Sequence, residues 1–250
     1  MKRFFILLAV AAIFQTIAFG QKKYEMVIEK TDGSETVINV EDNVRTYFRE
    51  RTNTDVSYTT CPDNNHPHMI DLGLPSGTKW ACCNVGASAP EDHGNHYAWG
   101  ETQPKSVYNW DTYQYGYYND DYDYSHLVNI GSDIAGTRYD AATANWGAPW
   151  RMPTSDQIRE LLDNTTSVGT TQNGVNGRKF TGPNGGTIFL PAAGGRWSDE
   201  LRNAGSYGYY WSSALEESIP YYACGLYFYS DYANWGNGNR DGGLSVRPVR

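Results

Sequence analysis

The chain has 250 residues, of which 40% are hydrophobic and 19% are charged, so it contains enough apolar side chains to bury a sizeable core. It carries 28 acidic against 20 basic residues, which gives a formal net charge of -8. Since an acidic surface repels phosphate backbones, we expect no nucleic acid among its partners.

The first 20 residues have the features of an export signal. A basic start at Lys2 and Arg3 precedes an apolar run over residues 4–18, and Ala18 and Gly20 supply the small residues that a signal peptidase reads. We predict a signal peptide over 1–20 and an exported chain that is periplasmic, at the cell surface or secreted. The apolar run is short for a membrane span and no later segment is long and apolar enough, so we expect no stable membrane span in the mature chain.

Residues 21–60 are predicted to form a β-hairpin module followed by a linker. Two β-prone runs, 24–30 and 35–40, flank Asp32-Gly33, which is a strong signal for a hairpin turn. Two strands alone are marginally stable in water, so we expect this hairpin to dock on another surface or to join an oligomer. The polar stretch 52–65 marks the boundary to a second domain over 61–250.

The second domain begins with short strands and a long loop. Residues 69–81 predict two short strands around a Pro-Ser-Gly turn. Residues 108–124 contain seven tyrosines among Asp, Asn and Gly with no helical or strand period, which predicts a long surface loop of the kind that is functional or disordered. Further along the chain, a short helix is predicted over 140–145 and core strands over 187–190 and 209–213.

The clearest helix signal follows Pro153. Thr154 or Ser155 can serve as the N-cap, and Gln157 stands at capping-box distance from Thr154. The apolar side chains of Ile158, Leu161 and Leu162 share one face, so the helix is predicted to pack on the core through that face.

The segment 207–250 is predicted to be a hairpin, a polar loop and a closing strand. Cys224, Leu226 and Phe228 alternate with Gly225, Tyr227 and Tyr229, which is the period of a half-buried strand with its tyrosines facing outward. Residues 230–243 are rich in Gly, Asn and Asp, which predicts a loop. A final strand is predicted over 244–249.

The four cysteines are Cys61, Cys82, Cys83 and Cys224. An even number of cysteines in an exported chain permits disulfides, and we favour a bridge from Cys61 to Cys82 or Cys83 because it closes a short loop. Cys224 is interpreted as a buried, small apolar residue. The adjacent pair lacks the C-x-x-C spacing of a zinc or redox motif, so we expect no metal on these cysteines.

Six short motifs in order give the chain a family resemblance. They are Val85-Gly86-Ala87, Tyr97-Ala98-Trp99-Gly100-Glu101, Trp150-Arg151-Met152-Pro153-Thr154, Phe189-Leu190-Pro191-Ala192-Ala193-Gly194, Tyr210-Trp211-Ser212-Ser213 and Leu244-Ser245-Val246-Arg247-Pro248-Val249. From about Cys61 to Arg250 the chain resembles the Fibrobacter succinogenes major paralogous domain family. That family looks like a branch of the C-type lectin-like fold, related to formylglycine-generating enzymes and to the variable proteins of diversity-generating retroelements.

The resemblance implies a fold and a binding region. It implies a loop-rich α+β, C-type lectin-like domain with short antiparallel sheets and about two helices, in which the first and last strands pair. It also implies that the segment from Trp211 to Trp235 forms an exposed sheet edge or loop used for binding.

The residues give little support for catalysis. An oxidase of the formylglycine-generating type needs a reactive cysteine pair in its C-terminal half, where this chain has only Cys224. The five histidines are His66, His68, His93, His96 and His126, and all lie in predicted loops. His66 with His68, or His93 with His96, could gather a metal ion, but solvated loop histidines are the commoner outcome.

Calcium-dependent sugar recognition is also not indicated. The chain has no Glu-Pro-Asn or Gln-Pro-Asp motif of the lectins of this fold. Asp120, Asp121 and Asp123 alternate loosely, but no Gly and Glu complete a calcium loop, so we interpret them as a solvated acidic loop. We therefore predict no catalytic residue, no metal and no cofactor.

The tyrosines carry the functional prediction. Fifteen of the 20 lie in two windows, 108–124 and 207–232. Tyrosine mixed with Ser, Gly, Asn and Asp is the composition of antibody binding loops, although such rings can equally pack on one another. The predicted contact residues are Tyr227, Tyr229, Asp231, Tyr232, Asn234, Trp235, Asn237, Asn239 and Arg240.

The sequence thus predicts an exported, non-enzymatic binding protein that recognises a protein or glycan surface through its C-terminal aromatic loop. Two alternatives stay open. One is a metal-dependent oxidase of the formylglycine-generating type, and the other is a structural or assembly protein of the cell envelope in which the front hairpin adds a strand to a neighbour.

Overall fold

The computed structural model describes residues 24–29, 35–40, 68–119 and 123–250. The chain divides into two units, Met1–Asn53 and Thr54–Arg250. In the first unit, β1 (Tyr24–Glu29) pairs antiparallel with β2 (Glu35–Val40), which confirms the two predicted strands. The predicted signal peptide, the Asp-Gly turn, Cys61 and His66 lie outside the described residues.

The second unit is an α+β domain of short elements, as predicted. Its strands and helices are β3 (Met69–Asp71), β4 (Lys79–Ala81), β5 (His96–Tyr97), α1 (Ala141–Trp146), α2 (Ser155–Asn164), β6 (Thr166–Gln172), β7 (Val175–Thr181), β8 (Thr187–Pro191), β9 (Gly195–Trp197), β10 (Glu200–Arg202), β11 (Gly208–Leu215), β12 (Tyr222–Tyr229), β13 (Tyr232–Asn239) and β14 (Leu244–Ser245). Among the described residues, no helix has the length and apolar character needed to cross a membrane.

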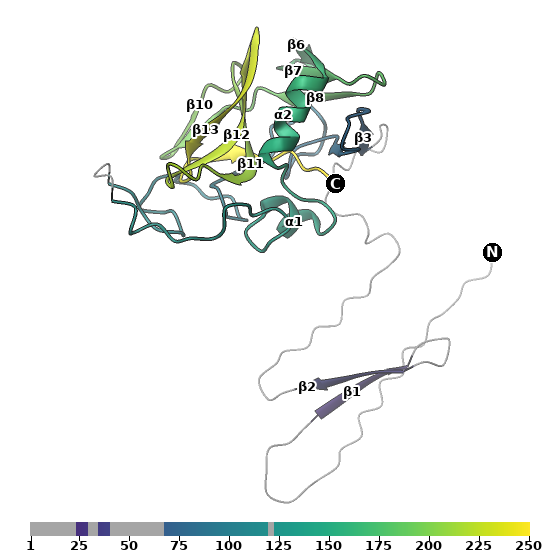
Figure 1. Ribbon diagram of the computed structural model, residues 1–250, viewed down its shortest axis with the longest axis vertical. Helices are drawn as coiled ribbons and strands as arrows, with labels where there is room; N and C mark the ends of the chain where they lie inside the picture. Colours follow the sequence, from purple (N-terminus) through teal and green to yellow (C-terminus); the bar gives the residue numbers. More distant parts are fainter. Residues whose placement is uncertain (1–23, 30–34, 41–67, 120–122) are drawn as a thin grey trace, which may run out of the picture. The chain divides into compact units, whose positions relative to one another are not determined.

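Among the described residues, a five-stranded sheet in the order β13-β12-β11-β14-β5 is the largest sheet of this unit, and Figure 1 shows its β11–β13 part. Neighbouring strands in it are antiparallel except for β11 and β14, which are parallel. A second sheet has the order β6-β7-β8, and α2 contacts β11, β12 and β13. The β13 strand is thus an edge strand of the large sheet, and α2 packs beside the β11–β13 part of it.

Local sequence signals account for both helices. The Asp140 carboxylate caps α1 by accepting hydrogen bonds from the amides of Ala142 and Thr143. In α2 the Thr154 hydroxyl accepts from the Gln157 amide, and the Gln157 side chain accepts from the Thr154 amide, which is the predicted capping box. These contacts satisfy amide groups that the first helical turn leaves without partners.

The β12 strand confirms the predicted alternation, but the loop predicted over 230–243 is wrong. Residues 232–239 form β13, which pairs with β12 along its whole length. One glycine helps to explain how an Asn- and Gly-rich segment can be a strand. A Cβ atom at Gly236 would lie 2.8 Å from the Tyr227 ring, whereas one at Gly238 would make only ordinary contact, 3.5 Å from the Trp211 ring. The bare backbone of β13 at Gly236 therefore lies under a large ring from the neighbouring strand β12.

The closing strand is shorter than predicted. Only Leu244–Ser245 forms β14, and the last residues instead lie against β4. The backbones of Lys79 and Arg250 exchange two hydrogen bonds of 2.9 Å, and the Ala81 amide donates to Pro248 O at 2.9 Å. The C-terminal residues therefore pair with β4. The first described strand of this unit, β3, also pairs with β4, and the last strand, β14, pairs with β11 and β5, so the first and last strands do not pair as the resemblance implied.

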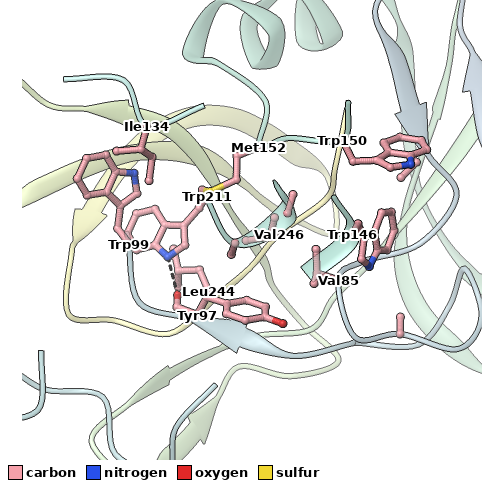
Figure 2. Close-up of a cluster of buried hydrophobic side chains, with 14 of the residues drawn as sticks. Val85, Tyr97, Trp99, Ile134, Trp146, Trp150, Met152, Trp211, Leu244 and Val246 are labelled. Carbon is pink, nitrogen blue, oxygen red and sulfur yellow. Dashed lines mark hydrogen bonds between the residues drawn. The ribbon is translucent and has the colours of Figure 1, made fainter. Parts of the chain in front are cut away.

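The core contains many indole rings (Figure 2). Trp99, Trp146 and Trp211 are each at most 2% exposed. Trp211 Nε1 donates to Tyr97 O at 2.8 Å, so this ring fills the core and still satisfies its polar atom (Figure 2). A second cluster packs Ile158 and Leu161 of α2 against the other face of the large sheet.

The tyrosine-rich loop is irregular, as predicted, but part of it is buried. Tyr108, Tyr113 and Tyr118 are 1%, 6% and 6% exposed. Tyr108 Oη donates to His96 O at 2.6 Å, and Tyr113 Oη donates to Trp99 O at 2.7 Å. These tyrosines cover the core, which leaves the second tyrosine window as the better candidate for binding.

Candidate aromatic binding surface

The register of β12 and β13 divides the predicted contact residues between two faces of the sheet. Residues directly opposite in an antiparallel pair point to the same side, and successive residues point to opposite sides. Tyr229 pairs with Tyr232 and Tyr227 with Asn234, so these four share one face. Trp235 pairs instead with the buried Leu226, and Asn237 and Asn239 follow it on the second face.

On the first face, six aromatic rings form a continuous cluster that we call the aromatic platform. Its members are Trp197, Tyr207, Tyr209, Tyr227, Tyr229 and Tyr232. Successive centroids are 5.6 Å apart from Trp197 to Tyr209, 5.7 Å to Tyr207, 5.4 Å to Tyr229, 5.4 Å to Tyr232 and 5.9 Å to Tyr227. Tyr229 and Tyr232 are 38% and 39% exposed, so the platform is open to a partner.

Amide side chains fix the hydroxyl groups of the platform. Asn234 Nδ2 donates to Tyr232 Oη at 2.6 Å, and Asn203 Nδ2 donates to Tyr209 Oη at 3.2 Å. A hydrogen bond with Tyr232 and, to a smaller extent, burial raise the pKa of Tyr227 above its ordinary value, and burial raises the pKa of Tyr209. Tyr227 and Tyr209 therefore stay neutral at physiological pH, so their hydroxyls can both donate and accept hydrogen bonds.

The second face presents a different arrangement. Trp235 is 42% exposed, and the Arg159 guanidinium of α2 lies 4.3 Å from the centroid of its ring. A guanidinium at this distance over an indole is a cation–π contact. Asn237 is exposed and Asn239 half-buried on the same face. Trp235 therefore cannot act together with the platform on one flat ligand.

Arg240 was predicted to contact the ligand, and this prediction is wrong. It is only 2% exposed, and its guanidinium lies 5.0 Å from the centroid of Trp99. It donates to Tyr113 Oη at 2.9 Å and to the carbonyls of Val128 and Pro220 at 3.2 Å each. These internal partners explain why it is buried, so it holds loops together and does not reach a surface ligand. Asp231, in contrast, is exposed in the turn between β12 and β13.

Sequence reasoning missed three members of the platform. Tyr207 and Tyr209 carry the same every-second-residue signal as Tyr227 and Tyr229, and the pairing of β11 with β12 sets Tyr209 opposite Tyr227. Trp197 comes from β9, and no local signal links it to the other rings.

The described residues considered for metal or thiol chemistry do not converge on one site, although His68 Nδ1 lies 3.5 Å from Cys82 Sγ. His96 is buried, its Nε2 is 3.2 Å from Ala193 O, and burial lowers its pKa to about 4. His126 stacks on Tyr117 at a centroid distance of 4.3 Å. Burial raises the pKa of the Cys224 thiol, which is 7% exposed as the apolar interpretation expected. Within residues 68–119 and 123–250, no group of three or more His, Cys, Asp or Glu side chains gathers as a metal site.

Comparison with known families gives one finding. The model of a domain of unknown function, DUF8237, matches residues 157–249, which run from α2 to the end of the chain and contain the whole aromatic platform. No curated protein and no solved structure matches the chain.

Proposed function

We propose that this chain is an exported, non-enzymatic binding protein that recognises a protein or glycan surface through the aromatic platform. The observation that carries the proposal is the gathering of six rings on one open sheet face. Tyr and Trp bury a large area on contact at little cost in conformational entropy, because each has only two side-chain torsions. Isolated exposed rings are ordinary, whereas a contiguous aromatic patch marks an interaction site.

We further propose a C-type lectin-like fold for the second unit. Three features support it: C-terminal residues paired with β4, long irregular segments between short strands, and, among the described residues, two helices with the longer one against the main sheet. The export signal predicted over residues 1–20 would place the platform outside the inner membrane, where surface proteins and glycans are available as ligands.

The experiment that tests the proposal compares binding of the full-length chain and two variants to arrays of glycans and cell-surface proteins. The first variant, Tyr227→Ala with Tyr232→Ala, removes two platform rings. The matched control, Trp235→Ala, removes an exposed ring of the same hairpin on the opposite face. Truncating an aromatic anchor typically costs about 2 kcal/mol. We therefore expect the platform variant to bind more than tenfold more weakly and the control to bind like the parent.

Equal loss in both variants would contradict the assignment of binding to one face. If the parent chain binds nothing on either array, the binding proposal fails, and the assembly role of the β1–β2 hairpin becomes the function to test next. Thermal unfolding of each variant, followed by circular dichroism, shows whether a loss of binding comes from a loss of fold.

A further inference from the structure

A polar groove borders the aromatic platform at the turn between β12 and β13. Its volume is about 550 Å³, within the range of roughly 300–1,000 Å³ that small-molecule sites occupy. Tyr207 and Tyr229 belong to both the groove and the platform. The other side chains that matter here are Thr170 and Asn176 from the β6–β7 hairpin, Ser206, and Asp231 from the turn.

Hydrogen bonds between its elements fix the walls of this groove. Arg178 of β7 is 7% exposed and donates to the carbonyls of Tyr229 and Ser230 at 3.3 and 3.0 Å. A Cβ atom at Gly169 would lie 2.4 Å from Ser230 O, so β6 touches the turn through bare backbone. The opposite wall is held by Asn176, whose Nδ2 donates to Gly205 O at 3.0 Å. The groove is thus organised before any ligand arrives, which lowers the entropic cost of binding.

The chemistry of the lining selects a class of ligand. Two phenol rings supply flat apolar faces, while hydroxyl, amide and carboxylate groups supply hydrogen-bond partners at the rim. A sugar ring needs this combination, because one face presents C–H groups and its edge presents hydroxyls. The lining has no aliphatic side chain larger than alanine, and its other apolar ring, that of Phe228, is only 2% exposed, so an apolar peptide side chain would find little to bury against.

The charge of the groove favours a neutral ligand over an anionic one. Asp231 places a carboxylate in the lining, and none of the lining residues is Lys, Arg or His. The guanidinium of Arg178, which bonds to the β12–β13 turn, is 7% exposed and donates to backbone carbonyls. The whole chain has a formal net charge of -8. Phosphorylated, sulfated or uronic-acid ligands would therefore meet repulsion here, while the carboxylate can accept hydrogen bonds from neutral hydroxyls.

We propose that this groove binds a neutral sugar unit of a glycan, with Tyr207 and Tyr229 against the ring and Asp231 accepting from its hydroxyls. The inference rests on the proposed function and names its ligand class. The platform beside the groove then contacts further units of the same glycan.

The test is titration calorimetry of the full-length chain with neutral oligosaccharides built from glucose, galactose or mannose, beside uronic-acid and sulfated oligosaccharides. Thr170→Trp fills the groove from the exposed side of β6, and Asp231→Ala removes the acceptor. Val168→Trp is the matched control, because Val168 is 54% exposed two residues earlier on the same strand and lies outside the groove. We expect at least one neutral oligosaccharide to bind the parent and the control, and to bind both groove variants at least tenfold more weakly.

Three results would overturn the inference: no binding of any neutral oligosaccharide, preferential binding of the acidic ones, or equal binding by Thr170→Trp and Val168→Trp. The first result, obtained together with platform-dependent binding to a protein array, would overturn the sugar groove and leave the proposed function standing. If the chain binds nothing on any array, both the sugar groove and the proposed function are refuted. Unfolding midpoints of the three variants identify any variant that fails to fold. If a tryptophan variant fails to fold, the oligosaccharide binding of Asp231→Ala tests the inference.

Discussion

Replacing Asp241 by asparagine should change how the stability of the protein depends on pH. Asp241 is 6% exposed, and its Oδ1 has no hydrogen-bond partner among the described residues. Burial, together with the nearby Glu101 carboxylate, raises its pKa from 3.8 to about 6, although its own backbone amide and Lys105 act in the opposite direction. Lys105 forms an ion pair with Glu101, whose carboxylate lies 2.9 Å from Lys105 Nζ.

Because burial raises the pKa of Asp241, this residue makes the protein less stable as pH rises. The folded state holds this proton more tightly than the unfolded state, so the protein is most stable when Asp241 is protonated and loses stability as pH rises from about 4 to about 6. A shift of two pKa units corresponds to about 3 kcal/mol at neutral pH, since one unit is worth about 1.4 kcal/mol. About 2 kcal/mol of this penalty develops between pH 4 and pH 7.

Urea unfolding of the parent and of Asp241→Asn at pH 4 and pH 7 measures this quantity. All other titrating groups are shared, so their contributions cancel in the difference between variant and parent. We expect this difference to move in favour of the variant by about 2 kcal/mol between the two pH values. A difference that is the same at both pH values would refute the reasoning, because the buried carboxylate would then carry no penalty.

Two further stability predictions concern a pair of glycines and the N-cap of α2. Gly225→Ala should destabilise the domain by about 1–3 kcal/mol, because its Cβ would lie 2.4 Å from Tyr210 O, which is backbone and cannot move aside. Gly238→Ala on the adjacent strand, where a Cβ makes only ordinary contacts, should be neutral or slightly stabilising, and equal urea midpoints for the two variants would disprove this contrast. Thr154→Ala should cost about 1 kcal/mol by removing the capping hydroxyl of α2, whereas an unchanged midpoint would mean that Gln157 alone suffices.

Local signals predicted the elements that local contacts stabilise. The capping box of α2 involves residues three apart, and the alternation along β12 follows from one sheet face being buried. The β13 strand was missed because its Asn and Gly residues favour turns when considered alone. Pairing with β12 overrides that preference, and the ring of Tyr227 occupies the space that Gly236 leaves.

In the candidate site too, the residues placed by a local pattern were predicted and those placed by distant contacts were not. Tyr227, Tyr229, Tyr232 and Asn234 were predicted together, and the strand register keeps them on one face. The sequence could not show that Trp235 points the other way, because that follows from β13 being a strand. Arg240 was misassigned because two of its partners, the carbonyls of Val128 and Pro220, come from distant parts of the chain.

The buried arginines separate the residues that hold this domain together from those that form its surface. Arg178, Arg240 and Arg247 each donate to backbone carbonyls of at least two other residues, for Arg247 those of Ala81 and Phe189. Every amino acid supplies the same backbone carbonyl. Mutations in the segments that the arginines anchor can therefore exchange one side chain for another while the anchor remains. A lineage of such proteins could acquire new ligands by changing surface residues around a constant set of guanidinium groups.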